Sequence, residues 1–159
     1  MTTNIPFIPS FDEIPKPQVV TLVAAARAGT KVLQSFLDGH QEILMVPGYP
    51  LMYLYPHWRD WVKTNSNTLS WQLLIDLLCE KHASILDSRR VLGLTGLERL
   101  GKEKNEYVKI DEELFRTAMK KLLGDSPISR KRFLLAIHYS YGICKGQDIH
   151  KCPVLIYHL

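Results

Sequence analysis

The stretch of the chain with the clearest capacity for chemistry follows its first apolar run. It reads Arg27-Ala28-Gly29-Thr30-Lys31 and combines two cationic side chains, a hydroxyl and a glycine. The preceding run, Val19–Ala26, is broken only by Thr21 and predicts a strand buried on both faces of a sheet. A helix that starts directly after such a turn directs unpaired backbone N–H groups and the positive end of its dipole toward the turn. The pattern therefore predicts an anion site, most naturally for phosphate.

The helix that positions this turn is predicted over Val32–Leu37. Apolar residues recur there at three- and four-residue spacing, and Gly39 stands where the helix would end. A second short strand, Ile43–Val46, follows. Strand, turn, helix and strand within about thirty residues make a βαβ unit, in which the helix begins at the carboxyl end of the first strand.

The order Arg-Ala-Gly-Thr-Lys, an apolar helix and then Leu37-Asp38-Gly39-His40 resembles the phosphosulfate-binding loop of the sulfotransferase family. That family commonly has Pro-Arg-Ser-Gly-Thr-Thr, followed by a helix that ends Leu-Leu-Asp-x-His-Pro. The resemblance covers residues 18–48 closely and the remainder of the chain in outline. The turn differs from a Walker A loop, because Ala24 replaces the first glycine and Thr30 replaces the lysine.

The resemblance implies transfer of a sulfonate group from phosphoadenosine phosphosulfate, the co-substrate, to a hydroxyl of a carbohydrate or other small acceptor, without a metal ion. It implies that Arg27, Ala28, Gly29, Thr30 and Lys31 hold the 5′-phosphate of this donor, and that Arg27 also takes part in catalysis. Ala28 stands where the family has serine and removes one hydroxyl donor, for which the charge of Lys31 could compensate. The alternative is a tight strand-to-helix turn with two solvated cations and no ligand.

The general base and the acceptor site are expected in the aromatic segment 49–61. Many relatives have a glutamate after the second strand, where this chain has Pro47 and Gly48. His57 is the candidate base because an imidazole has a suitable unperturbed pKa, and the alternative is a histidine stacked beside Trp58. Flat rings and tyrosine hydroxyls suit a carbohydrate or phenolic acceptor, unless these rings only cover the sheet edge. The candidate acceptor-binding residues are Tyr49, Tyr53, Tyr55 and Trp58.

The remaining elements are predicted from cap residues and apolar spacing. Within segment 49–61 an irregular turn is expected to lead to a short helix over 57–63. Further helices are predicted over Trp71–Lys81 after Ser70, from Asp111 to Gly124, and over Arg130–Lys145 after Ser129. Residues 83–109 predict only short helical pieces broken by glycines. The last run, Pro153–Leu159, predicts a buried strand.

Together these elements predict one α/β domain over residues 18–159, with a P-loop NTPase-like parallel sheet, flanking helices and a helical insertion. An extended N-terminal arm over residues 1–17, with four prolines, precedes the domain. A strand of such a sheet normally continues into a loop and a covering helix. We therefore expect the domain to be incomplete at its C-terminus and to correspond to the N-terminal half of a sulfotransferase-like domain.

Composition narrows the classes of partner. A net charge of +4 over 159 residues favours anionic ligands but lacks the dense basic stripe of a nucleic-acid-binding protein. The N-terminus does not resemble a signal peptide, and no apolar run is long enough to span a membrane. The three widely spaced cysteines are expected to be reduced thiols. The sequence therefore predicts a cytoplasmic protein. Two other functions stay open: a truncated, non-catalytic phosphate-binding or interaction remnant, and another P-loop transferase such as a magnesium-dependent kinase.

Overall fold

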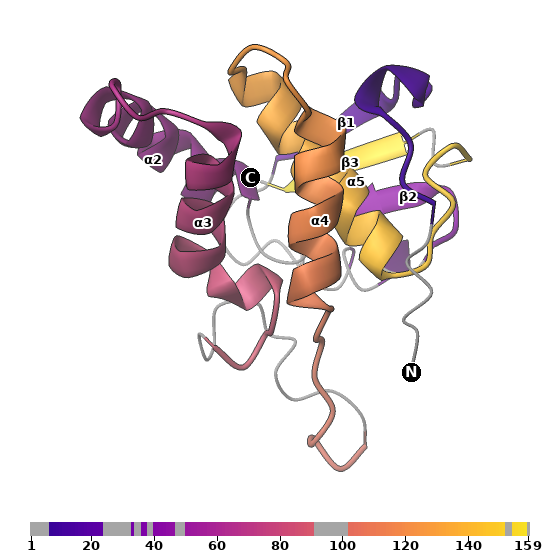
Figure 1. The fold of residues 1–159 in the computed structure, drawn as a ribbon. Helices are drawn as coiled ribbons and strands as arrows, with labels where there is room; N and C mark the ends of the chain where they lie inside the picture. The colour runs from indigo at the N-terminus through magenta and orange to yellow at the C-terminus, as the bar shows by residue number, and fades with distance from the viewer. Residues whose placement is uncertain are drawn as a thin grey trace, which may run out of the picture.

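The computed structural model describes residues 7–23, 33, 36, 37, 40–46, 50–90, 102–151 and 154–158. Helices and strands are mixed in this part of the chain, which confirms the coarse prediction of an α/β protein (Figure 1). Three strands form a parallel sheet in the order β1-β3-β2. They are β1 (Gln18–Leu22), β2 (Ile43–Met45) and β3 (Val154–His158).

The last strand of the chain lies between the first two. β3 pairs in parallel with both, so that Leu22 stands opposite His158 and Met45 opposite Ile156. The first two strands are therefore parallel, as a βαβ unit requires, but they are not neighbours. Because all three run the same way, their carboxyl ends lie at one edge of the sheet.

The prediction that the first strand is buried on both faces is wrong for its described part. Val19 and Val23 are 47% and 76% exposed. β1 is an edge of the described sheet, and α5 (Arg130–Cys144) packs over β2 at the other edge. An apolar run cannot by itself reveal whether a strand lies at the centre or at the edge of a sheet.

The predicted helix after β1 is described only at residues 33, 36 and 37, all of which are helical. Leu33 is 45% exposed and Phe36 is 77% exposed. Other positions of this prediction, among them Val32, Asp38 and Gly39, lie outside the described residues.

The segment predicted as an irregular turn and a short helix is one continuous helix, α2 (Pro50–Thr64). A proline at the first helical position needs no hydrogen bond, whereas Pro56 stands inside the helix and removes one. Leu54 and Trp61 are buried, and Trp58 is half-buried between them in the sequence. This stripe at spacings of four and three residues anchors the helix despite Pro56.

Three helices begin at the predicted caps. They are α3 (Trp71–Lys81), α4 (Glu112–Leu123) and α5. In each, a side-chain oxygen of the N-cap accepts a hydrogen bond from the backbone N–H three residues on: Ser70 from Leu73 at 3.2 Å, Asp111 from Leu114 at 3.0 Å and Ser129 from Arg132 at 3.4 Å. Glycines with φ of 49° and 71°, Gly124 and Gly146, follow α4 and α5 as predicted.

The core is layered around α5. α4 packs on one side of α5 and β2 on the other, and α3 packs against α4 (Figure 1). α5 is consequently buried from Phe133 to Ile143. Its partners include the fully buried Phe115 and Met119 of α4 and Leu44 of β2.

The N-terminal arm is described from Phe7 and is anchored to the domain. Ile8 and Ile14 are 2% and 9% exposed, while Phe7 is 79% exposed. Between them the short 3-10 helix η1 (Phe11–Glu13) places the Phe11 ring edge-on to Tyr139 of α5, with centroids 5.7 Å apart. In segment 83–109 the described structure is the 3-10 helix η2 (Ala83–Ile85) and a bridge between Asp87 and Lys109.

Candidate functional site

The carboxyl edge of the sheet is where the sequence places the anion site. β1 ends at Leu22 and β2 at Met45, and α2 begins five residues beyond β2. The C-terminal end of β3 lies on the side of the sheet that faces α2 (Figure 1). The edge is thus assembled from segments far apart in the sequence.

The proposed ligand-binding residues themselves are only partly described. Arg27, Ala28, Gly29, Thr30 and Lys31 lie outside the described residues, as does Tyr49. Residues 53 and 55 are helical in α2, and their side chains are likewise outside the description. His57 and Trp58 are described in full.

His57 belongs to a cluster of three rings at the junction of α2 and α3. Its exposed imidazole stacks on Trp61, one helical turn further on, with centroids 6.0 Å apart and an interplanar angle of 15°. The ring of His82, directly after α3, lies 5.6 Å from His57 and 5.9 Å from Trp61. The stacking partner of His57 is therefore Trp61, whereas the sequence suggested Trp58.

The electrostatic state of this cluster is set by His82. Its side chain is 8% exposed, and burial together with the neighbouring His57 lowers the pKa of His82 to about 4. His82 is consequently neutral at pH 7. His57 therefore lies beside an uncharged ring, on the solvent-exposed side of α2.

Trp58 contributes to packing. It is half-buried, and its ring lies 5.4 Å from Phe133 of α5. Phe133 in turn stacks on Trp71 of α3, at 5.9 Å and 5°. This contact ties α2 to α3 and α5, and binding of an acceptor by Trp58 stays a prediction.

A cavity of about 570 Å³ lies elsewhere, between the end of the α3–η2 segment and the start of α4. It is lined by Leu86, Asp87, Arg90, Lys109, Ile110, Asp111, Glu112 and Glu113. The sequence analysis did not find it, since the only local signal was the cap at Asp111. The walls come from two segments that the chain brings together across residues 91–101.

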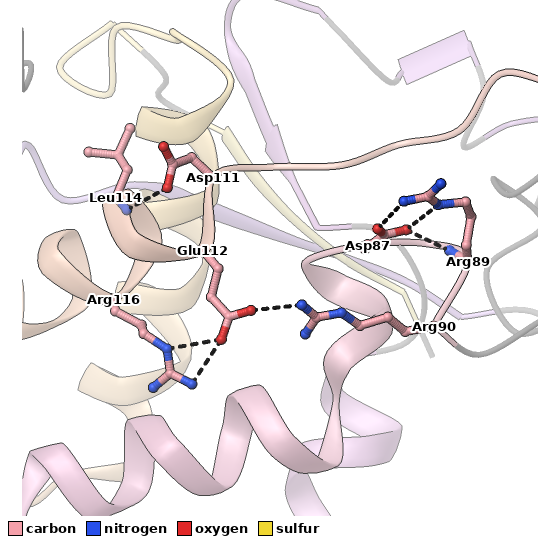
Figure 2. A network of polar contacts seen from close by, with 7 residues as sticks. All are labelled: Asp87, Arg89, Arg90, Asp111, Glu112, Leu114 and Arg116. Carbon is pink, nitrogen blue, oxygen red and sulfur yellow. Dashed lines mark hydrogen bonds and ion pairs between the residues drawn. The ribbon is translucent and has the colours of Figure 1, made fainter. Parts of the chain in front are cut away.

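One ion pair joins the two walls of this cavity, and others lie within each wall (Figure 2). Arg90 contacts Glu112 at 2.9 Å, and Glu112 also contacts Arg116 at 3.0 Å. Partial burial raises the pKa of Glu112, but hydrogen bonds from Arg116 and Arg90 outweigh it and bring the pKa below its usual value. Hydrogen bonds from Arg89, at 2.7 Å for the closest, lower the pKa of Asp87 to about 2.

This arrangement disfavours a phosphate ligand. Four carboxylates line the cavity against two cations, and Arg90 is already paired with Glu112. An entering phosphate would meet net negative charge. The network is better suited to holding α4 against the segment after α3.

Thiol chemistry finds no support in the described residues. Cys79 is buried and Cys144 half-buried, and neither forms a disulfide. Burial raises the pKa of Cys79 to about 11 and that of Cys144 to about 12, so both are protonated at neutral pH. Cys152 lies outside the described residues.

Two findings complete the description of the candidate site. Within the described part of the chain, every helix is too short or too polar to cross a bilayer. No protein family, no curated protein and no solved structure matches this chain.

Proposed function

We propose that this chain is a sulfotransferase-like protein with a P-loop NTPase-like sheet, which transfers a sulfonate group from phosphoadenosine phosphosulfate to a hydroxyl of a carbohydrate or other small acceptor. The observation that carries the proposal is the parallel sheet: its strands end together at the edge where the chain continues from β1 toward Arg27 and Lys31. In open parallel α/β sheets, ligands bind beyond the carboxyl ends of the strands.

In the proposed reaction, the acceptor hydroxyl, the donor phosphate, the two cations and the base each have a separate role. The acceptor oxygen attacks sulfur, the bond from sulfur to the phosphate oxygen breaks, and phosphoadenosine phosphate leaves with the bonding electrons. Negative charge grows on that phosphate oxygen, and fixed cations at Arg27 and Lys31 stabilise it. The proton lost by the acceptor hydroxyl passes to a base, for which His57 is the candidate.

What supports His57 in this role is its placement and exposure. α2 starts from the edge at which β2 ends, and His57 lies on the solvent side of this helix, stacked on Trp61. The stack fixes one face of the imidazole and leaves the exposed ring accessible. A neutral His82 beside it does not oppose proton uptake as a second charged imidazole would.

Binding of phosphoadenosine phosphate to the full chain, measured by isothermal titration calorimetry, tests the proposal. Arg27→Ala combined with Lys31→Ala should weaken binding by at least about 100-fold, because hydrogen bonds to charged groups contribute roughly 1.5–3 kcal/mol each and the variant removes two such groups. The matched control, Lys102→Ala with Lys145→Ala, also removes two positive charges, from exposed positions outside the predicted site, and should bind as the wild type does. Equally weak binding by all three proteins would refute the phosphate site.

The rate of sulfonate transfer, measured alongside donor affinity, shows whether His57 acts as a base or as a donor-binding residue. We expect His57→Gln to lower the rate of sulfonate transfer by about 100-fold or more, a typical contribution of general base catalysis, without changing the affinity for phosphoadenosine phosphate. A loss of affinity in this variant would instead place His57 in donor binding.

A second candidate is a protein that binds phosphate or a partner without turnover. The exposed apolar side chains Val19, Val23, Leu33 and Phe36 favour it, because exposed apolar surface often marks an interaction site. Retained binding of phosphoadenosine phosphate with no transfer to any acceptor would support this candidate. Binding that requires Mg²⁺ would instead favour a kinase-like transferase.

A further inference from the structure

We propose that the groove between the N-terminal arm and α5 binds a small ligand with an apolar chain and a carboxylate head, such as a medium-chain fatty acid. This site is separate from the proposed sulfonate-transfer site. The groove has a volume of about 330 Å³, within the range of small-molecule pockets. It is lined by Phe11, Asp12, Ile14, Lys16, Pro17, Val19, Lys131, Leu135 and Tyr139.

The floor of the groove consists of side chains that are buried in the core. Ile14, Leu135 and Tyr139 are 9%, 7% and 1% exposed. Lys131, Leu135 and Tyr139 are spaced four residues apart in α5, so they lie along one face of that helix. An alkyl chain laid along this face would be removed from water by side chains that are already ordered by the core.

The charges at the rim are not balanced within the protein. The carboxylate of Asp12 is paired with Arg132 at 3.0 Å, and the guanidinium of Arg132 lies 4.4 Å from the centre of the Phe11 ring. Lys16 and Lys131 are both exposed, and neither forms an ion pair with another described residue. Two lysines without an ion-pair partner among the described residues thus border an apolar floor. This combination is complementary to a ligand with an anionic head and an apolar chain.

The groove is open to solvent beside the sheet edge. Val19, at its border, is 47% exposed. Val19 lies near the start of β1, whereas Arg27 and Lys31 follow the opposite end of this strand in the sequence. Figure 1 shows the N-terminal arm lying beside β1. Ligands at the two sites should therefore not compete.

Calorimetric titration of the full chain with decanoate tests the inference. Decanoate should bind, each CH₂ added from hexanoate to decanoate should tighten binding about threefold to fourfold, and decanol should bind at least tenfold more weakly than decanoate. Lys16→Ala with Lys131→Ala should weaken decanoate binding at least tenfold, while Lys102→Ala with Lys145→Ala should not. Absence of decanoate binding, or equal binding by decanol, would overturn the proposal.

A second variant tests the groove with a substitution that leaves the fold unchanged. Val19→Glu places a carboxylate at an exposed border position, where it cannot disturb the core, and should abolish decanoate binding while the circular dichroism spectrum is unchanged. Arg27→Ala with Lys31→Ala should bind decanoate as the wild type does, so that failure of the sulfotransferase proposal leaves this one standing. Unchanged decanoate affinity in Val19→Glu, or competition by phosphoadenosine phosphate, would place the ligand outside the groove.

Discussion

His57 and His82 come from different segments of the chain, and the protein brings their rings within 5.6 Å of each other. The two imidazoles are in unlike environments, because His57 is exposed and His82 is 8% exposed. Only the exposed ring is accessible to a ligand from solvent. The buried ring, with Trp61, supports it and links α2 to the end of α3.

Burial of His82 predicts a loss of stability in weak acid. The folded-state pKa of about 4 lies below the unfolded value near 6.5, so the unfolded chain binds more protons between these two pH values. The free energy of unfolding should therefore fall as the pH drops from about 6.5 toward 4. After allowance for solvent screening, we expect this residue to account for a decrease of about 1–2 kcal/mol between pH 7 and pH 5.

Urea denaturation followed by tryptophan fluorescence at these two pH values measures the effect. His82→Phe, which keeps a ring against Trp61, should lose most of the decrease, whereas His150→Gln, at an exposed position, should keep it. An unchanged pH dependence in His82→Phe would assign the acid sensitivity to other groups.

At the level of elements, the close approach of α5 to β2 depends on Gly142. A Cβ atom at this position would lie 2.5 Å from Cδ2 of Leu44 and 3.4 Å from Ile149 Cγ2. Leu44 is fully buried and cannot move outward. Gln147, just after α5, strengthens the same contact by donating hydrogen bonds to the backbone oxygens of His40 and Ile43, at 3.1 and 3.0 Å.

We expect Gly142→Ala to destabilise the protein by about 1–2 kcal/mol. Overpacking typically costs about 1–3 kcal/mol, and the 2.5 Å approach places this site at the upper end, at about 2–3 kcal/mol. Replacing a helical glycine by alanine regains up to roughly 1 kcal/mol, which leaves the expected net loss. Leu44→Val shortens the opposing side chain, so the double variant should be less destabilised than the sum of the two single variants. Thermal and urea unfolding of the four proteins measure this coupling; increased stability of Gly142→Ala would show that the sheet is not held this closely.

The elements that the sequence predicted correctly are those with local signals. Ser70, Asp111 and Ser129 are cap residues followed by apolar residues at helical spacing, and each begins a helix as expected. The first half of α2 was missed, because Pro56 and a cluster of aromatic residues conceal its spacing, whereas its second half matches the predicted short helix over 57–63. Its packing against α3 and α5 outweighs the local preference of proline.

Features that depend on distant residues could not be predicted in the same way. β3 pairs with β1 although more than one hundred residues separate the two strands in the sequence. The apolar run Val19–Ala26 alone therefore predicts neither the strand order nor the exposure of Val19. The cavity between the segment after α3 and the start of α4 likewise depends on the pairing of Arg90 with Glu112, which are 22 residues apart in the sequence (Figure 2). For the candidate site, the roles of Arg27–Lys31 and His57 stay predictions from the sequence, and the sequence did not predict the ring cluster that His82 completes.

For the molecule as a whole, the free edge of β1 is the most consequential surface. β3 is the only described strand that pairs with β1, and among the described residues no strand pairs with the other side of β1. Val19 and Val23, at the two ends of this edge, are exposed apolar residues. Unprotected strand edges of this kind favour association between chains.

We expect the protein to self-associate reversibly through this edge as its concentration rises. Val23→Lys should weaken the association, because a lysine directly after an edge strand opposes strand pairing, and should change the free energy of unfolding by no more than about 0.5 kcal/mol. Phe7→Lys is a matched control, since Phe7 is as exposed as Val23, at 79% against 76%, but lies over Lys121 of α4. Sedimentation velocity over a range of concentrations measures the association. An equal effect of both substitutions would indicate that general surface hydrophobicity causes it. A wild-type protein that stays monomeric at every concentration would show that the edge of β1 does not pair.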